Sequence, residues 1–184
     1  MTVSPALRDR LRHLARASIE YGLEAGRPIE VTLQEWPETL CEHRATFVTL
    51  EIEARLRGCI GALDATRPLV RDVSANAFAA AFRDPRFPPV TTLEFPNLDI
   101  HVSVLSPVEP MAVRSEAELL ERLRPGVDGL ILEELGKRGT FLPAVWRSLP
   151  QAGEFVEQLK AKAGFAPDYW SESVRAYRYT TEEF

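Results

Sequence analysis

The chain has 184 residues, of which 45% are hydrophobic and 27% charged. This is an ordinary globular composition, long enough for one domain with its own core and unlike disordered or fibrous chains. The net charge of −5, without a run of Lys or Arg, disfavours nucleic-acid binding. The longest apolar run, residues 77–82, is far shorter than a membrane span, and no signal-peptide segment begins the chain. We therefore expect a cytoplasmic protein without membrane association.

The first predicted elements are a helix and a β-hairpin. Ser4 followed by proline is a helix start, apolar residues at helical spacing predict a helix over residues 5–21, and Gly22 would end it. Residues 48–52 alternate between apolar and polar, which is typical of a half-buried strand. Residues 56–63 are expected to return as its hairpin partner.

A second helix and a rigid loop follow the hairpin. Residues 68–82 are rich in alanine with an apolar stripe, which predicts a helix that packs closely on a sheet. Residues 84–89 contain three prolines, so neither a helix nor a central strand can form there. Residues 98–105 alternate again and predict another strand.

The remaining residues predict a helix, a hairpin and a last helix. Ser115 and Glu118 have the spacing of a capping box at a helix start. Residues 127–135 and 139–142 are expected to pair around a glycine-containing turn, and helical residues follow from 143 to 162. Hairpins outnumber crossover units, so the sequence predicts an α+β fold with a mainly antiparallel sheet.

The strongest candidate site is the segment LRGCIG at residues 56–61. Gly58 and Gly61 leave the backbone around Cys59 open, and Arg57 would favour a thiolate over a thiol at that cysteine. The alternative is that Cys59 fills space in the interior, as free cysteines commonly do. Without an export signal, Cys41 and Cys59 are expected to be free thiols.

A second candidate site is the proline-rich loop, which carries Arg83, Asp84 and Arg86. Prolines would order this loop in advance, and arginines offer paired donors to an anion. The alternative is that Asp84 and Arg86 hold a turn through local hydrogen bonds. The sequence alone leaves both interpretations open.

His101 is the one histidine that could serve as a base for Cys59, provided that their strands are neighbours. The alternative is a solvated histidine on a strand. Cys41, His43, Cys59 and His101 lack the spacing of a zinc site, so no metal is expected. The chain also lacks Walker, dinucleotide-binding and CxxC motifs, and we expect no cofactor.

The segment LRGCIG resembles the hexapeptide of the AMMECR family, whose prokaryotic members are called AmmeMemoRadiSam system protein A. Residues 84–90 (DPRFPPV) resemble a second family segment, and residues 102–105, 126–130 and 141–143 resemble later ones in the family's order. The likeness spans essentially the whole chain, residues 1–184, which is therefore expected to be a single AMMECR-type domain.

The resemblance implies an α+β fold in which two β-and-α repeats share one curved sheet. It also implies a cleft in which residues 56–61 lie beside residues 83–90, in a domain that could divide into two lobes. Arg57, Cys59, Asp84 and Arg86 match family segments and are the residues carried over to that cleft. His101 is not a position of the family's segments, so the resemblance does not support it as a base.

The resemblance implies no particular reaction. Prokaryotic members are typically encoded beside a Memo-type protein and a radical S-adenosylmethionine enzyme, which are therefore the expected partners. One hypothesis is an enzyme that depends on Cys59, or a component that binds a small molecule. Its substrate, small or macromolecular, is unidentified. The residues expected to bind the substrate are Arg57, Gly58, Gly61, Asp84 and Arg86. The other hypothesis is a non-catalytic adaptor of those two partners, in which Cys59 is a wall residue.

Overall fold

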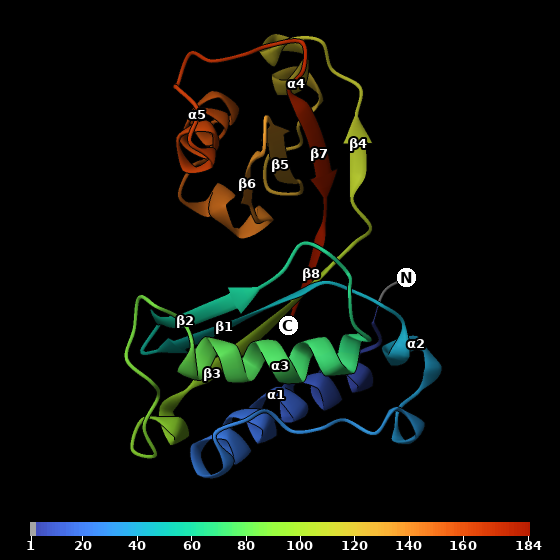
Figure 1. The fold of residues 1–184 in the computed structure, drawn as a ribbon, viewed down its shortest axis with the longest axis vertical. Helices are drawn as coiled ribbons and strands as arrows, with labels where there is room; N and C mark the ends of the chain where they lie inside the picture. Colours follow the sequence, from blue (N-terminus) through green and yellow to red (C-terminus); the bar gives the residue numbers. More distant parts are fainter. Residues whose placement is uncertain (1–2) are drawn as a thin grey trace. The chain divides into compact units, whose positions relative to one another are not determined.

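A computed structural model describes residues 3–184, which divide into two compact units (Figure 1). The first unit runs to Leu105 and includes Glu182–Phe184, whereas the second comprises the residues between them. Each unit combines helices with a four-stranded sheet, which confirms the α+β class. Among residues 3–184, no helix combines the length and apolar character that a bilayer crossing requires.

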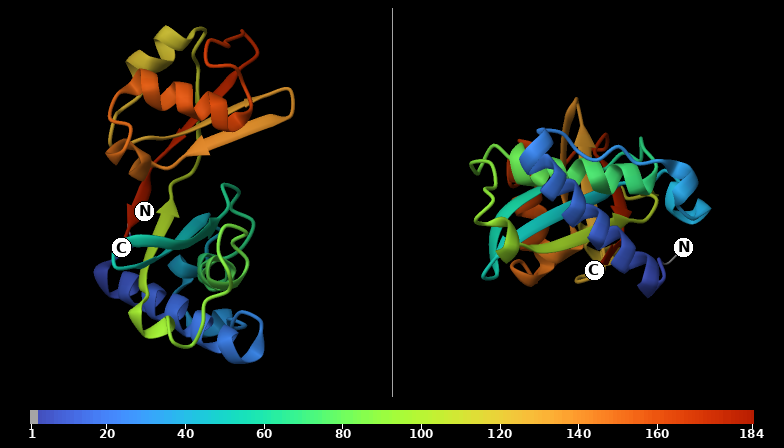
Figure 2. Two further views of the ribbon diagram at one scale, coloured as in Figure 1. Left: turned by 90° about the vertical axis from the view of Figure 1, so that its left-hand side faces the viewer. Right: turned by 90° about the horizontal axis from the view of Figure 1, so that it is seen from below.

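The first unit places its long helices on one face of its sheet (Figures 1 and 2). The strand order is β2-β1-β3-β8, and β1 pairs antiparallel with both β2 and β3. Its elements are α1 (Pro5–Ala25), η1 (Leu33–Glu35), α2 (Glu38–Cys41), β1 (Thr46–Ile52), β2 (Arg55–Gly61), α3 (Leu69–Phe82), η2 (Phe95–Asn97), β3 (Asp99–Leu105) and β8 (Thr181–Glu183).

Helix α1 continues past the glycine at which the sequence predicted its end. It ends at Ala25, and Gly26 adopts the left-handed conformation that follows many helices. Gly22 is buried because α1 crosses α3 there: a Cβ at this position would lie 2.7 Å from the rings of Phe78 and Phe82. Gly22 is therefore a packing residue, and the helix-stop interpretation was wrong.

The core of the first unit lies between the sheet and α1 and α3. Val48 and Leu50 of β1 are fully buried on the sheet side of this core. Val73 and Ala77 of α3 are fully buried on the helix side. The buried carboxylate of Asp72 in α3 accepts hydrogen bonds from Thr46 of β1 and from Asn76. The helix is thus joined to the sheet by polar as well as apolar contacts.

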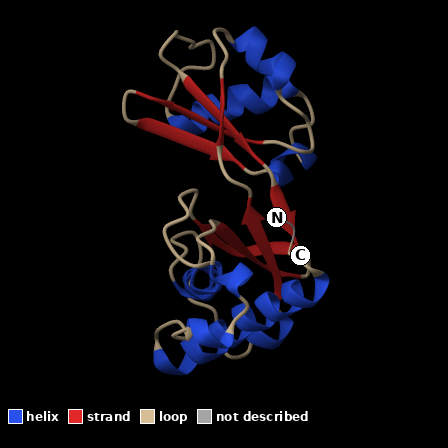
Figure 3. Ribbon diagram, turned by 90° about the vertical axis from the view of Figure 1, so that its right-hand side faces the viewer, coloured by secondary structure: helices blue, strands red, loops and turns tan. Residues whose placement is uncertain are grey.

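The second unit packs two helices on its sheet, whose order is β4-β7-β5-β6 (Figure 3). Ser115 accepts a hydrogen bond from the Glu118 amide at 3.2 Å, so the predicted helix cap is confirmed. The Trp146 and Phe155 rings stack at 3.8 Å in its core. Its elements are β4 (Glu109–Met111), α4 (Glu116–Arg122), β5 (Gly129–Glu134), β6 (Lys137–Phe141), η3 (Pro143–Arg147), α5 (Ala152–Ala163) and β7 (Arg175–Tyr179).

The strands form two sheets, whereas the family resemblance implied one shared sheet. The chain leaves β3 and enters β4 through residues 106–108, where Pro107 has no N–H to donate to a ladder. On the returning chain, Thr180 separates β7 from β8 and its carbonyl accepts the N–H of Ser106. The short strands β4, β7 and β8 were missed by the sequence analysis because three to five residues carry little periodicity.

We expect Gly58→Ala to lower the free energy of unfolding by about 2 kcal/mol or more, because the added methyl overpacks the interface between β2 and α3. A Cβ at Gly58 would lie 2.2 Å from the backbone oxygen of Ala80. Urea denaturation followed by circular dichroism measures the change.

Gly153→Ala is the matched control, since a Cβ there meets nothing within 4 Å and the residue lies in α5. Its stability should be unchanged or higher by up to ~1 kcal/mol, because alanine is the better helix former. Equal stability of the two variants would contradict the close packing of β2 on α3.

Candidate functional site

The candidate site is built on the β1–β2 hairpin. Its turn residues, Glu53 and Ala54, have φ values of 50° and 58°. Turns with two positive φ values match the twist of paired strands and hold a tight hairpin. Both strands are thereby fixed in register from Ile52 and Arg55 onward.

A β-bulge at Arg57 decides which way Cys59 points. Glu51 pairs with Leu56 but Leu50 pairs with Gly58, so Arg57 is the extra residue of β2. Beyond the bulge Cys59 pairs with Thr49; without it, Cys59 would stand opposite the core residue Val48. Because one residue of slip exchanges the faces of a strand, the bulge turns Cys59 away from α1 and α3.

The glycines around Cys59 serve the packing of the hairpin. Gly58 is buried against α3, where it allows close approach to Ala80. A Cβ at Gly61 would lie 2.3 Å from the Thr46 carbonyl oxygen and 2.4 Å from the Phe47 ring. The structure thus gives both glycines a steric reason that is independent of any substrate.

The backbone N–H and C=O groups of Cys59 point away from β1, toward the open edge of the sheet, where β2 is the last strand. Its N–H donates to Oδ2 of Asp84 at 2.9 Å, and its carbonyl accepts from Nη2 of Arg86 at 3.3 Å. Unpaired edge groups are normally solvated or covered. Here two side chains of the proline-rich loop take the place of a neighbouring strand.

Asp84 also binds Arg86 in a fork. Nε of Arg86 donates to Oδ1 at 2.9 Å and Nη2 donates to Oδ2 at 2.7 Å, while the Arg86 backbone N–H donates to Oδ1 at 3.1 Å. Asp84 is 4% exposed. The local hydrogen bonds expected as one alternative are therefore present, and they hold the loop against β2.

The charges of this pair reinforce each other. The Arg86 side chain, and in smaller part the Cys59 N–H, hold the pKa of Asp84 well below its usual range, against the opposing effect of burial. The pKa of Arg86 is raised, chiefly by its hydrogen bond to Asp84 and in small part by the Cys59 thiol. Arg86 therefore stays cationic close to the thiol, and its Nη1 lies outside the bonds to Asp84 and Cys59.

Cys59 Sγ lies next to a hydroxyl group. Thr49 Oγ1 donates a hydrogen bond to Sγ at 3.2 Å. The outward direction of the Cys59 backbone groups makes Thr49 and Cys59 a non-hydrogen-bonded pair, in which facing side chains approach most closely. Cys59 is half-buried and free, as is Cys41, whose Sγ bonds the carbonyls of Leu33 and Trp36 instead.

Arg57 joins β2 by an ion pair to Glu94, the residue that precedes η2. Its Nε and Nη2 donate to the two carboxylate oxygens of Glu94 at 2.8 and 3.2 Å. The Arg57 side chain and a Thr91 N–H lower the pKa of Glu94 to about 2. The Arg57 side chain is 12% exposed, and its Nη1 is buried without a hydrogen-bond partner among residues 3–184. Arg57 and Arg86 both lie over the Phe87 ring, at 5.9 and 5.5 Å.

His101 does not lie beside Cys59. Strand β1 separates β2 from β3, and Thr49 pairs with Cys59 on one side and with His101 on the other. Two strand spacings, about 10 Å, separate the two residues. Because β2 and β3 are not neighbours, His101 is too far away to take a proton directly from Cys59. The His101 side chain is 52% exposed, and its Nε2 lies 3.8 Å from Glu51.

The structure brings together Arg57, Cys59, Asp84 and Arg86, and it adds residues that the sequence analysis missed. Thr49 is one of them. The alternation of apolar and polar residues in β1 predicted that Thr49 lies on a strand, but its pairing with Cys59 depends on a bulge that no sequence pattern marked. Phe87 and Glu94 are the others, and only tertiary contact joins them to Arg57. Within the described chain, no three His, Cys, Asp or Glu residues gather in a way that could hold a metal ion.

Comparison with known proteins identifies the family of this chain. Residues 12–184 match the AMMECR1 family. The chain belongs to the AMMECR1 family. A protein of Methanothermobacter thermautotrophicus is 38% identical over 100% of this chain and 98% of its own length. Protein MJ0810 of Methanocaldococcus jannaschii is 39% identical, covering 92% of this chain and 85% of its own.

The fold is also that of a solved AMMECR1-family relative. The crystal structure of the uncharacterized protein PH0010 from Pyrococcus horikoshii matches with a TM-score of 0.91 and 36% identity, over 98% of this chain and 92% of that chain. The names of these relatives specify no reaction.

We expect Glu94→Gln to be less stable than the parent protein by about 1 to 2 kcal/mol at pH 7, after allowance for solvent screening. The pKa of Glu94 falls from 4.5 to about 2 on folding, so its stabilisation is complete above pH 4.5 and is lost as the pH falls toward 2. The difference between the two proteins should shrink over that interval in urea denaturation.

Glu24→Gln is the control for this measurement, because Glu24 is an exposed residue of α1. It should track the parent protein at every pH. A stability deficit of Glu94→Gln that stays constant down to pH 2 would contradict the ion pair with Arg57.

Proposed function

We propose that this AMMECR1-family protein acts through Cys59 as a thiol-dependent enzyme on an anionic small molecule. The observation that carries the proposal is the placement of one thiol. Its backbone is held at both the N–H and the carbonyl by Asp84 and Arg86, and its Sγ accepts a hydrogen bond from Thr49. These contacts fix the position of a thiol that faces away from the core of the first unit.

The surroundings of Cys59 suit a nucleophile. The thiolate is the reactive form of cysteine, and cations and hydrogen-bond donors near the sulfur favour it. Arg86 supplies the cation and Thr49 the donor. No histidine is in contact with Sγ among residues 3–184, so the proposal assigns activation to these two groups rather than to a base.

The two arginines support an anionic substrate. Arg86 is 53% exposed and has Nη1 outside its bonds to Asp84 and Cys59, whereas Arg57 has a buried Nη1 without a partner among the described residues. Guanidinium groups bind carboxylates and phosphates through parallel hydrogen bonds. Phe87, which contacts both guanidinium groups, would offer an apolar face beside them.

A second candidate function is recognition of a protein partner by the same surface. Leu56 is 44% exposed and Leu93 is 86% exposed, and each adjoins one member of the Arg57–Glu94 ion pair. Exposed leucines near a fixed loop are suited to protein contact. A Memo-type protein or a radical S-adenosylmethionine enzyme, as the family resemblance implies, is the partner to test.

We expect iodoacetamide to alkylate Cys59 at least about tenfold faster than Cys41 at pH 7. A cation and a hydroxyl donor lie near the sulfur of Cys59, whereas the Cys41 sulfur contacts two backbone carbonyl groups. Peptide mapping by mass spectrometry gives the rate at each cysteine. Arg86→Gln should slow alkylation of Cys59 several-fold, whereas Arg55→Gln, at an exposed position of the same strand, should leave it unchanged.

Cys41→Ser provides a background in which only Cys59 reacts. A Cys59 that remains inert until the protein unfolds would contradict the enzyme proposal. The surface around it would then be tested for protein binding, by pull-down of the two expected partners.

A further inference from the structure

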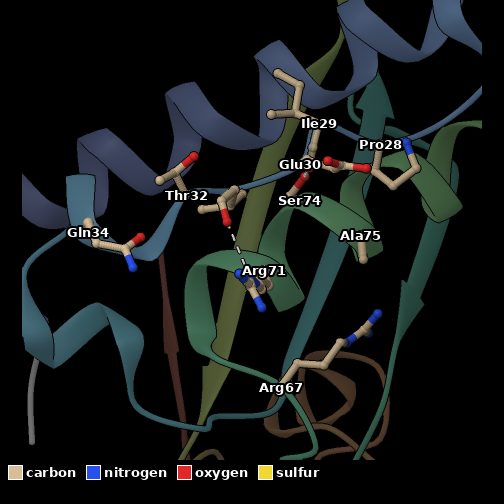
Figure 4. Close-up of a pocket in the computed structure, with 10 residues that line it drawn as sticks. Pro28, Ile29, Glu30, Thr32, Gln34, Arg67, Arg71, Ser74 and Ala75 are labelled. Carbon is tan, nitrogen blue, oxygen red and sulfur yellow. Dashed lines mark hydrogen bonds between the residues drawn. The ribbon is translucent and has the colours of Figure 1, made fainter.

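A pocket of about 560 Å³ lies in the first unit, on the helix side of its sheet. One wall is the segment of residues 28–34 that follows α1, and the other is the beginning of α3 (Figure 4). Pockets of 300–1,000 Å³ are the usual size for small-molecule sites. Cys59 faces away from α3, so this pocket is separate from the site of the proposed function.

The wall formed by residues 28–34 is held in place by buried hydroxyl groups. Ser74 of α3 donates to the carbonyl of Ile29 at 2.9 Å, and the Ile29 N–H donates to Ser18 of α1 at 3.3 Å. Ser18 and Ser74 are 0% and 1% exposed. Nε of Arg71 donates to the Val31 carbonyl at 3.3 Å. The pocket is therefore formed by fixed backbone rather than by a loose loop.

The charges that line the pocket are mainly positive, although the whole chain carries −5. Arg67 and Arg71 both lie in the lining, and Figure 4 shows Arg71 between Thr32 and Arg67. The single acidic lining residue, Glu30, is 92% exposed and pairs with Arg27, which is outside the lining. The pocket thus offers two guanidinium groups against one carboxylate that is already paired.

The two arginines differ in the ion pairs and hydrogen bonds that they already make within the protein. Arg67 forms a 2.7 Å ion pair with Asp72 and a hydrogen bond with Asn76, which fix its position. Arg71 forms no ion pair with a carboxylate of residues 3–184, and its single bond to Val31 uses only Nε. The terminal nitrogens of Arg71 are therefore left for an acceptor that the chain itself does not supply.

We infer that this pocket binds the carboxylate or phosphate group of a small organic anion through Arg71, with Arg67 as the second cation. The parallel N–H groups of a guanidinium fit either anionic group. Pro28 and Ala75 line the remainder and would contact an apolar part of the ligand. The inference adds a binding site to the molecule and does not depend on the reactivity of Cys59.

Titration of the whole protein with pyrophosphate and, separately, with succinate tests the inference by NMR. We expect saturable shifts of backbone amide signals confined to residues 28–34 and 67–75. Binding of pyrophosphate alone would identify a phosphate ligand, and binding of succinate alone a carboxylate ligand. Arg71→Gln should weaken the binding by about tenfold or more, because it removes the charged donors.

Two further variants keep this result interpretable. Arg71→Lys retains the charge but not the paired donors, so its affinity should lie between those of the parent and Arg71→Gln. Arg55→Gln, on β2 and outside the pocket, should bind like the parent. The inference would be overturned by the absence of saturable binding of either anion, by equal binding to Arg71→Gln, or by shifts that map to residues 57–61 and 84–87 instead.

Discussion

The carboxylate of Asp84 is the group on which the arrangement around Cys59 depends. It accepts the Cys59 N–H and the guanidinium fork of Arg86, and Arg86 in turn donates to the Cys59 carbonyl. Both backbone groups of an edge-strand residue are thereby satisfied by one short loop. A buried carboxylate is stable only when it is paired and hydrogen-bonded, and Asp84 meets both conditions.

The position of the thiol follows from two constraints that act together. The bulge at Arg57 sets the register, so that Cys59 faces Thr49 rather than the core. The loop then fixes the strand edge, through Asp84 to Cys59 and through Glu94 to Arg57. A functional group on a strand that is held on both sides is more precisely placed than one on a free loop.

The two faces of the first unit differ in the chemical groups that they present to a ligand. The face that carries Cys59 presents a thiol that accepts a hydrogen bond from Thr49, and the function that we propose uses this thiol as a nucleophile. The pocket between residues 28–34 and α3 has guanidinium groups and no nucleophile in its lining, which suits reversible binding. In both places an arginine is held by a backbone carbonyl and keeps other donors for a ligand.

The sequence predicted the elements in which a periodic pattern extends over many residues. It failed where contacts between distant parts of the chain determine the structure. Alternation in β1 and β3 and the apolar stripe of α3 identified those elements with nearly correct ends. Gly22 was misread as a helix stop because the rings that cover it come from α3. The segments at residues 56–61 and 84–90 were predicted to lie side by side, and Asp84 and Arg86 do contact Cys59.

Other features of the site have no local signature. Arg57 and Glu94 are separated by 37 residues, and nothing in either neighbourhood marks their pairing. The expected role of His101 assumed that β2 and β3 are adjacent, whereas the strand order places β1 between them. Strand order depends on pairing between residues far apart in the chain, such as Thr49 and His101, which a single sequence does not reveal.

Hydrogen exchange at the Cys59 amide tests most directly whether Asp84 holds the site. In the parent protein this amide should exchange slowly, because it donates to the buried Asp84 carboxylate. Asp84→Ala should accelerate its exchange by about tenfold or more, as a locally opened amide does. Glu24→Ala changes an exposed carboxylate of α1 and should leave the Cys59 amide protected. Equal exchange in the parent and Asp84→Ala would contradict the account.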